Sequence, residues 1–194
     1  MLGHRGLLMI FGSRLVLGGL LGTRADAAPS GQFGLYAYGG GIGGAQVFYS
    51  HDVAFIGNQT QMDDEAAASV VFTMGPNNAF VGNPDMKSSR GIPSWSNKAF
   101  FIPTPASSSH RVGFTTEISE PDPDTDTDTS GFIFYGATAL HLSADNTLHG
   151  LWYVLPTQSN KIWSLHWNAT GDQSDGRLSV TLRSVPPVQP FDSA

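Results

Sequence analysis

Residues 130–170 decide the fold; they read SGFIFYGATALHLSADNTLHGLWYVLPTQSNKIWSLHWNAT and hold three of the four tryptophans. Within them, residues 161–167 alternate strictly. One face would carry Lys161, Trp163, Leu165 and Trp167, and the other Ile162, Ser164 and His166. This period of two predicts a strand with one buried face, the face of Trp163 and Trp167. Two more apolar runs, 132–142 and 148–155, precede it across turn residues, so the stretch predicts a three-stranded antiparallel meander.

The rest of the chain repeats the same signals on a smaller scale. Short apolar or aromatic runs alternate with glycine, proline and asparagine turns, and only residues 61–69 have any helical propensity. The further strands are expected at 33–38, 45–49, 53–56, 69–74, 79–81, 98–102, 110–116 and 177–185. About ten short strands with little helix predict an all-β, single-domain antiparallel sandwich or barrel.

The N-terminal residues predict export. Two apolar runs, 6–11 and 15–22, stand among basic residues, and Ala25-Asp26-Ala27 matches the small-x-small pattern of a signal-peptidase site. We therefore expect a signal peptide at 1–27 and a secreted domain at 28–194. No later apolar run reaches the ~18 residues that a membrane span requires. Within the domain we expect an acidic loop at 117–129 and a frayed tail at 186–194.

Charge and cysteine content exclude several classes of function. The net charge is −6, and loss of residues 1–27 would leave about −8, so nucleic acid and anionic membranes are poor partners. The chain has no cysteine, which excludes disulfides, thiolate metal sites and cysteine nucleophiles. Two acceptor sequons, Asn58-Gln59-Thr60 and Asn168-Ala169-Thr170, predict glycosylation at Asn58 and Asn168.

Two segments resemble cofactor-binding motifs but fail in detail. Residues 39–44 satisfy G-x-G-x-x-G, yet they lead into a strand pattern where a dinucleotide site needs a helix. The run Asp122, Asp124, Asp126 and Asp128 lacks the glycine and glutamate of a calcium loop, which favours a solvated loop. The sequence therefore predicts no cofactor.

The histidines and carboxylates do not form a recognisable catalytic or metal site. There is no H-x-H pair, so no metal is predicted; His141 and His149 would oppose each other if the chain turns near Asp145. There is no G-x-S-x-G elbow. A glycosidase needs two paired carboxylates, but nothing pairs any two of the available ones, which are Asp52, Asp64, Glu65 and Glu117. Catalytic residues are not identified, and the pattern favours a protein that is not an enzyme.

Aromatic side chains are the better functional signal. Most of them are expected in the core, whereas a ring exposed on a sheet or in a loop can stack on a sugar. Trp95 stands in the loop sequence Pro93-Ser94-Trp95-Ser96-Asn97. The alternation around Tyr38 and Trp152 does not decide whether each ring faces the core or the solvent. We expect ligand contacts from Trp95, Tyr38, Trp152, His141 and His149.

Five segments carry a resemblance: GLYAYGGGIGGAQVFY (34–49), VAFIGN (53–58), SGFIFYG (130–136), LHGLWYVLPT (148–157) and IWSLHWNATGD (162–172). Together they resemble a group of small secreted proteins of filamentous fungi. A fainter similarity extends to phialide-type fungal cell-wall proteins, which carry cysteines that this chain lacks. The group has no established reaction, so the resemblance implies an extracellular or cell-wall glycoprotein and no particular site.

The leading hypothesis is a secreted, non-enzymatic β-rich glycoprotein that associates with the cell wall or with an extracellular glycan. Two alternatives remain open: an extracellular carboxylate-dependent hydrolase and a carrier of a small apolar metabolite. The candidate functional surface lies on residues 39–44, Trp95 and the ends of the strands that hold His141 and His149.

Overall fold

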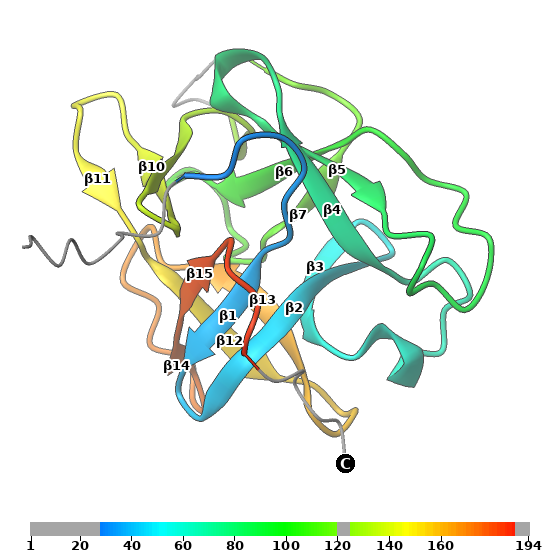
Figure 1. Cartoon of the computed structure of the whole chain (residues 1–194). Helices are drawn as coiled ribbons and strands as arrows, with labels where there is room; N and C mark the ends of the chain where they lie inside the picture. Colours follow the sequence, from blue (N-terminus) through cyan, green and yellow to red (C-terminus); the bar gives the residue numbers. More distant parts are fainter. Residues whose placement is uncertain (1–27, 120–124, 189–194) are drawn as a thin grey trace, which may run out of the picture.

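The computed structural model describes residues 28–119 and 125–188, and these residues form one domain of antiparallel strands (Figure 1). The strands are β1 (Tyr36–Gly39), β2 (Ile42–Ser50), β3 (Val53–Gly57), β4 (Ala68–Met74), β5 (Phe80–Pro84), β6 (Lys98–Pro103), β7 (Gly113–Thr115), β8 (Thr127–Asp128), β9 (Phe132–Tyr135), β10 (Thr138–Leu142), β11 (Leu148–His149), β12 (Trp152–Pro156), β13 (Ile162–Trp167), β14 (Leu178–Ser179) and β15 (Thr181–Arg183). Two short 3-10 turns, η1 (Gln59–Gln61) and η2 (Pro76–Asn78), are the only helical elements in these residues. The predicted all-β class is confirmed.

Strand β2 sets the topology because it pairs with three neighbours. Its first half pairs with β1, and its second half pairs with β3 on one side and β4 on the other. Pairing continues from β4 through β5, β6 and β7 back to β3, so six strands form a closed ring. Of the two predicted alternatives, a barrel describes this part of the domain better than a sandwich.

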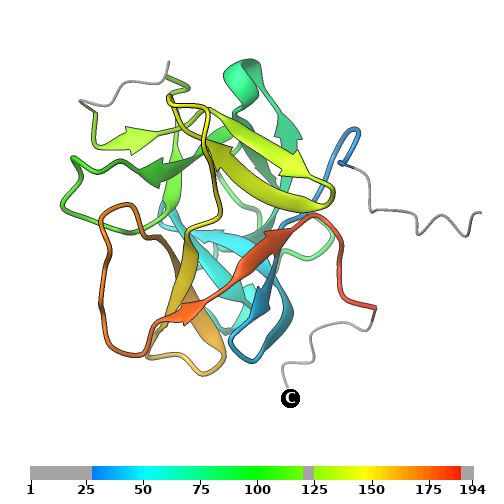
Figure 2. The ribbon, with the colours of Figure 1, turned by 90° about the vertical axis from the view of Figure 1, so that its left-hand side faces the viewer.

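Two extensions leave the ring and are joined by the C-terminal segment. From β2 the pairing runs through β1 and β15 to β10, and from β3 it runs through β13 to β12 and β14. Residues 178–183 connect the two extensions, since β14 pairs with β12 while β15 pairs with β1. Figure 2 shows this segment, in orange to red, crossing the molecule.

Phenylalanine rings fill the interior. The rings of Phe80 and Phe132 stack at 4.8 Å between centroids, and Phe72 meets Phe100 edge-on at 5.5 Å. All four side chains are fully buried. Aromatic pairs add about 0.5–1.5 kcal/mol each beyond the area that they bury, which matters in a domain with no disulfide.

The predicted three-stranded meander is wrong in its connections. Residues 132–142 form a hairpin of β9 and β10 rather than one strand, because Gly136, with φ at 60°, turns the chain back. Residues 148–155 divide at Gly150 into β11, which pairs with β10, and β12, which pairs with β13. The stretch therefore contributes to two different parts of the sheet.

Strand β13 is buried on both faces, not on one. Leu165 and Trp167 are buried and Trp163 is half-buried, as the alternation predicts. Ser164 and His166, on the opposite face, are also buried, and their side chains bond to each other at 2.8 Å between Oγ and Nε2. The bond gives each of these two buried side chains one partner, which a pattern of alternating polarity cannot reveal.

The structure describes only part of the predicted acidic loop and of the two chain ends. Thr127 and Asp128 form β8 and pair with β6, so the end of the predicted acidic loop is a strand. The predicted signal peptide (1–27), Asp122, Asp124 and residues 189–194 of the predicted tail lie outside the described residues. Within the described residues, no helix has the length and apolar character needed to cross a membrane.

The ring closes at the pair of Val53 and Gly113, which gives a direct test of the topology. A Cβ on Gly113 would overlap the carbonyl oxygen of Asp52 and lie 2.9 Å from the ring of Phe101. Gly113→Ala is expected to lower the free energy of unfolding by about 1–3 kcal/mol, as overpacking does. Urea unfolding followed by circular dichroism measures it.

Gly43→Ala is the matched control for this substitution. Gly43 also lies in a strand, but a Cβ there meets no atom within 4 Å. Its stability should stay within ~1 kcal/mol of the parent protein. Equal effects of the two substitutions would contradict the closed ring.

Candidate functional site

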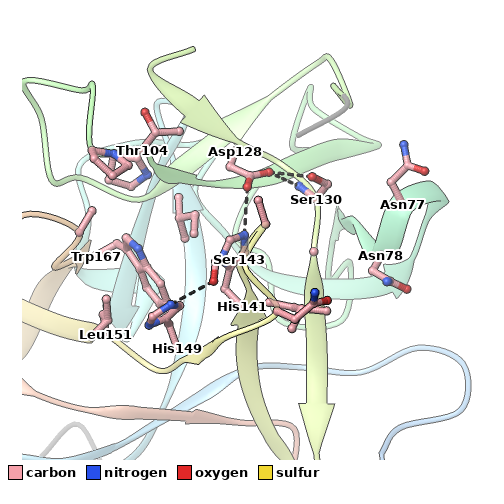
Figure 3. A pocket seen from close by; sticks show the side chains of 18 residues that line it. Asn77, Asn78, Thr104, Asp128, Ser130, His141, Ser143, His149, Leu151 and Trp167 are labelled. Carbon is pink, nitrogen blue, oxygen red and sulfur yellow. Dashed lines mark hydrogen bonds and ion pairs between the residues drawn. The ribbon is translucent and has the colours of Figure 1, made fainter. Parts of the chain in front are cut away.

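A cleft of about 560 Å³ opens where β6, β8, β10, β11 and the end of β13 approach one another (Figure 3). Figure 3 shows Trp167, Leu151 and His149 on one side and Asn77 and Asn78 on the other. Further apolar lining comes from Ile102, Pro103, Pro105, Leu142, Ala144 and Ala169. The cleft thus combines apolar walls with a small number of polar groups.

The polar residues of the cleft come from three separate segments, which are positioned by backbone pairing. Asp128 enters on β8, where it pairs with Ile102 of β6. His141 lies on β10, opposite His149 of β11. The link between β10 and β11 turns at Asn146, with φ at 63°, and this fixes the register of the two histidines.

Asp128 is the centre of the polar end of the cleft. One carboxylate oxygen accepts the backbone N–H of Ser130 at 2.9 Å and its hydroxyl at 2.7 Å. The other lies 3.0 Å from Nε2 of His141. Burial of Asp128 opposes its charge, but the hydrogen bonds from His141 and Ser130 outweigh burial and hold its pKa below the usual value. An ionised carboxylate only accepts, so His141 carries a proton on Nε2 and donates it.

His149 is oriented by a second chain of hydrogen bonds. The Ser143 hydroxyl lies 2.5 Å from the Asp145 carboxylate and 2.9 Å from the carbonyl oxygen of Thr147. The hydrogen bond from Ser143 lowers the pKa of Asp145. Because that hydroxyl has only one proton, and it points to an acceptor, His149 must donate from Nε2 to Ser143 across 3.1 Å.

The predicted opposition of His141 and His149 is confirmed, and both residues line the cleft. His141 is 8% exposed, while His149 is half-buried. Each imidazole is held by a neighbour through Nε2. Their role as ligand contacts stays a prediction.

The structure places Trp95 in the core rather than on the loop surface. It is 6% exposed, stacks on Tyr49 at 4.2 Å and donates its indole N–H to the carbonyl oxygen of Ala66 at 2.8 Å. A satisfied N–H removes the main cost of burying tryptophan. The expected ligand contact of Trp95 assumed an exposed ring, and that assumption is wrong.

Trp152 and Tyr38 do not line the cleft either. Trp152 is buried, donates its N–H to the carbonyl oxygen of Ala139 at 3.0 Å, and packs edge-on against Trp167 at 4.6 Å. Tyr38 is half-buried, and its hydroxyl donates to the carbonyl oxygen of Val185 at 2.8 Å. Both side chains therefore pack against neighbouring residues and donate hydrogen bonds to backbone carbonyl oxygens.

Trp95→Ala is expected to lower the free energy of unfolding by about 3–5 kcal/mol, because it leaves a cavity beside Tyr49. Urea denaturation measures it, and Tyr135→Ala is the control since Tyr135 is 76% exposed. If Trp95→Ala were as stable as the parent protein, the core position of this ring would be refuted.

The four candidate carboxylates lie outside the cleft. Asp52 forms an ion pair with Lys98 at 2.7 Å; burial opposes its charge, but the bonds from Lys98 and Tyr49 lower its pKa. Asp64 accepts the hydroxyl of Ser50 at 2.7 Å. Glu65 and Glu117 are exposed. The cleft therefore gives no support to a carboxylate-dependent hydrolase that uses these four residues.

Asp128 was not singled out by sequence, although one signal was present. In the sequence it is one member of a low-complexity acidic run. The sequence Asp128-Thr129-Ser130 directly precedes the apolar run of β9, and an aspartate two residues before a serine is a typical side chain-to-backbone turn. That turn forms here.

The sequons and the glycine-rich link lie at strand ends. Asn58 follows β3 and accepts the backbone N–H of Thr60 at 3.0 Å. Asn168 follows β13 and accepts the backbone N–H of Asp172. Their glycosylation stays a prediction. Residues 39–44 span the end of β1, a turn at Gly40 and Gly41, and the start of β2, which is a strand and not a helix.

His166 is a second buried histidine, away from the cleft. Its Nδ1 is buried without a hydrogen-bond partner among the described residues. Burial, and next the charge of Arg111, lower the pKa of His166 to about 4. For a histidine with a lowered folded-state pKa, the unfolded chain binds more protons between pH 6.5 and pH 4, so stability falls as pH falls through that window.

The expected loss from His166 is about 1–3 kcal/mol between pH 7 and pH 4. His166→Phe keeps the ring beside Tyr153 and should show a smaller loss of unfolding free energy over the same range. Asp172, whose pKa is lowered to about 2, begins to lose its stabilising effect as the pH approaches 4, but it is present in both proteins and does not alter the comparison. Thermal melts at several pH values measure the difference, and identical pH profiles would contradict it.

Within the described part of the chain, no group of three or more histidine, aspartate or glutamate side chains is arranged to hold a metal ion. Comparisons with protein-family models, with curated proteins and with solved structures found no match to this chain. The site is therefore interpreted from its own geometry. The resemblance to secreted fungal proteins stays a prediction.

Proposed function

We propose that the protein is an exported, non-enzymatic binding protein whose cleft takes a small ligand with an apolar body and a hydrogen-bonding end. One observation carries the proposal: an oriented polar network lies at one end of a cleft with apolar walls. A volume of about 560 Å³ falls in the range of sites for small molecules, roughly 300–1,000 Å³. Export and a location outside the cell or in the cell wall rest on residues 1–27 and the two sequons.

The network is formed before any ligand arrives. Asp128 holds three hydrogen bonds from Ser130 and His141. A preformed polar group loses little conformational entropy on binding, and this favours affinity. Ile102, Pro105 and Leu151 supply apolar contact area, which binds the body of a ligand through burial.

The direction of the hydrogen bonds argues against hydrolysis by Ser143. A serine nucleophile needs a neighbouring base that accepts its proton. Here the Ser143 hydroxyl is directed to Asp145 or Thr147, and His149 donates to it. His149 therefore supports the position of Ser143 instead of activating it.

A short glycan end is the second candidate ligand. Asn77, Asn78 and Asn146 line the cleft and are exposed, and amide side chains bind sugar hydroxyls. Burial of Trp95 and Trp152 removes two of the platforms on which a polysaccharide could stack. A single sugar unit at the rim is thus favoured over an extended chain along the surface.

Native mass spectrometry of the protein purified from its secreting host, followed by calorimetry with the ligand found, tests the proposal. Ala169→Phe fills the cleft and is expected to weaken binding at least ~10-fold by steric exclusion. Ser94→Phe adds the same ring at an exposed residue that does not line the cleft and should bind as the parent protein does.

Binding that survives Ala169→Phe would overturn the assignment of the cleft. Binding of long chitin, glucan or mannan chains that is insensitive to the same substitution would place the functional surface elsewhere.

A further inference from the structure

We infer that the hydrogen-bonding end of the ligand is a cationic amine, so that the cleft selects amines on an apolar body over alcohols and carboxylates. The inference rests on the proposed binding function. It follows from the charges that line the cleft and from the one lone-pair position of Asp128 that its neighbours leave unused.

The cleft has a fixed negative charge and no fixed positive one. Asp128 is the only acidic residue in its lining, and among the described residues neither lysine nor arginine lines it. A carboxylate has about four lone-pair positions, and the donors of Ser130 and His141 occupy three. One position of Asp128 is left for a ligand donor.

An ammonium group fits that position better than a hydroxyl. Both can donate to the ionised Asp128, and both bonds are strengthened by its charge, but only the ammonium adds the attraction between two opposite charges. The net charge of the chain, −6, also favours the approach of a cation.

Trp167 closes the apolar side of this end of the cleft. It lines the cleft but is 3% exposed and packs against Trp152, so it contributes apolar wall rather than an open ring face. Its ring meets His141 edge-on at 5.9 Å, and His141 lies 3.0 Å from Asp128. The charged end and the apolar body of the ligand therefore have adjacent places in the cleft.

The same lining disfavours anions. A carboxylate or phosphate on the ligand would meet the Asp128 charge without a lysine or arginine in the lining to offset it. Like charges brought together in a partly buried site repel strongly. The hydroxyl analogue avoids this repulsion, but its neutral donor gains no attraction between opposite charges.

A matched series of probes tests the inference on the parent protein: 2-phenylethylamine, 2-phenylethanol and phenylacetate, which share one apolar body. Calorimetry at pH 8 suits the series, because an ordinary histidine is then neutral while the amine keeps its charge. The amine is expected to bind at least ~10-fold more tightly than the alcohol, and the carboxylate most weakly.

Asp128→Asn should abolish the preference for the amine, because the amine loses the attraction of opposite charges; the alcohol, which loses only a bond from a neutral donor, should weaken less. Asp175→Asn makes the same change of net charge at an exposed residue outside the cleft and should keep the preference. Circular dichroism of both variants checks their folding.

The outcomes separate the two proposals. If the alcohol or the carboxylate binds the parent protein as tightly as the amine, the inference is overturned and the binding function stands. If none of the three probes binds, the inference and the proposed cleft function fail together. If Asp128→Asn does not fold, the ranking of the three probes on the parent protein decides alone.

Discussion

The double pairing of β2 is the constraint on which the rest of the structure depends. Phe48 pairs with Phe55 on one side and with Ser69 on the other, so this backbone segment belongs to the ring, while the first half of β2 starts one extension through β1. Without disulfides, hydrogen-bonded ladders and packed rings alone hold this junction. The cleft lies where residues of the two extensions approach strand β6 of the ring and β8, which pairs with β6.

Local polar satisfaction explains why the cleft can be polar at one end without disrupting the core. A buried carboxylate is costly unless several donors surround it, and Ser130 and His141 supply these donors to Asp128. The same principle governs the pair of Ser164 and His166 and the indole N–H groups of Trp95 and Trp152. Among the described residues, Nδ1 of His166 and Nη1 of Arg177 are the exceptions, since they are buried without a hydrogen-bond partner.

Period-two patterns were sufficient to predict most strands, and the turn near Asp145 was sufficient to predict that His141 opposes His149. Two features could not be predicted because they depend on distant contacts. Trp95 is buried by Tyr49, which is far away in the chain, and nothing near Trp95 indicates that partner. Asp128 owes its position to pairing with β6, while its own sequence context is typical of a solvated loop.

The pairing of β15 with β1 joins the two ends of the described chain, Arg183 with Tyr36. This contact joins residues that are distant in the sequence. Proteins rich in such contacts fold slowly, typically in milliseconds to seconds. The sheet can be completed only after its last strand has been synthesised. Until then the edges of β1 and β12 lack partners, which makes this interval the one in which the chain is most exposed to aggregation.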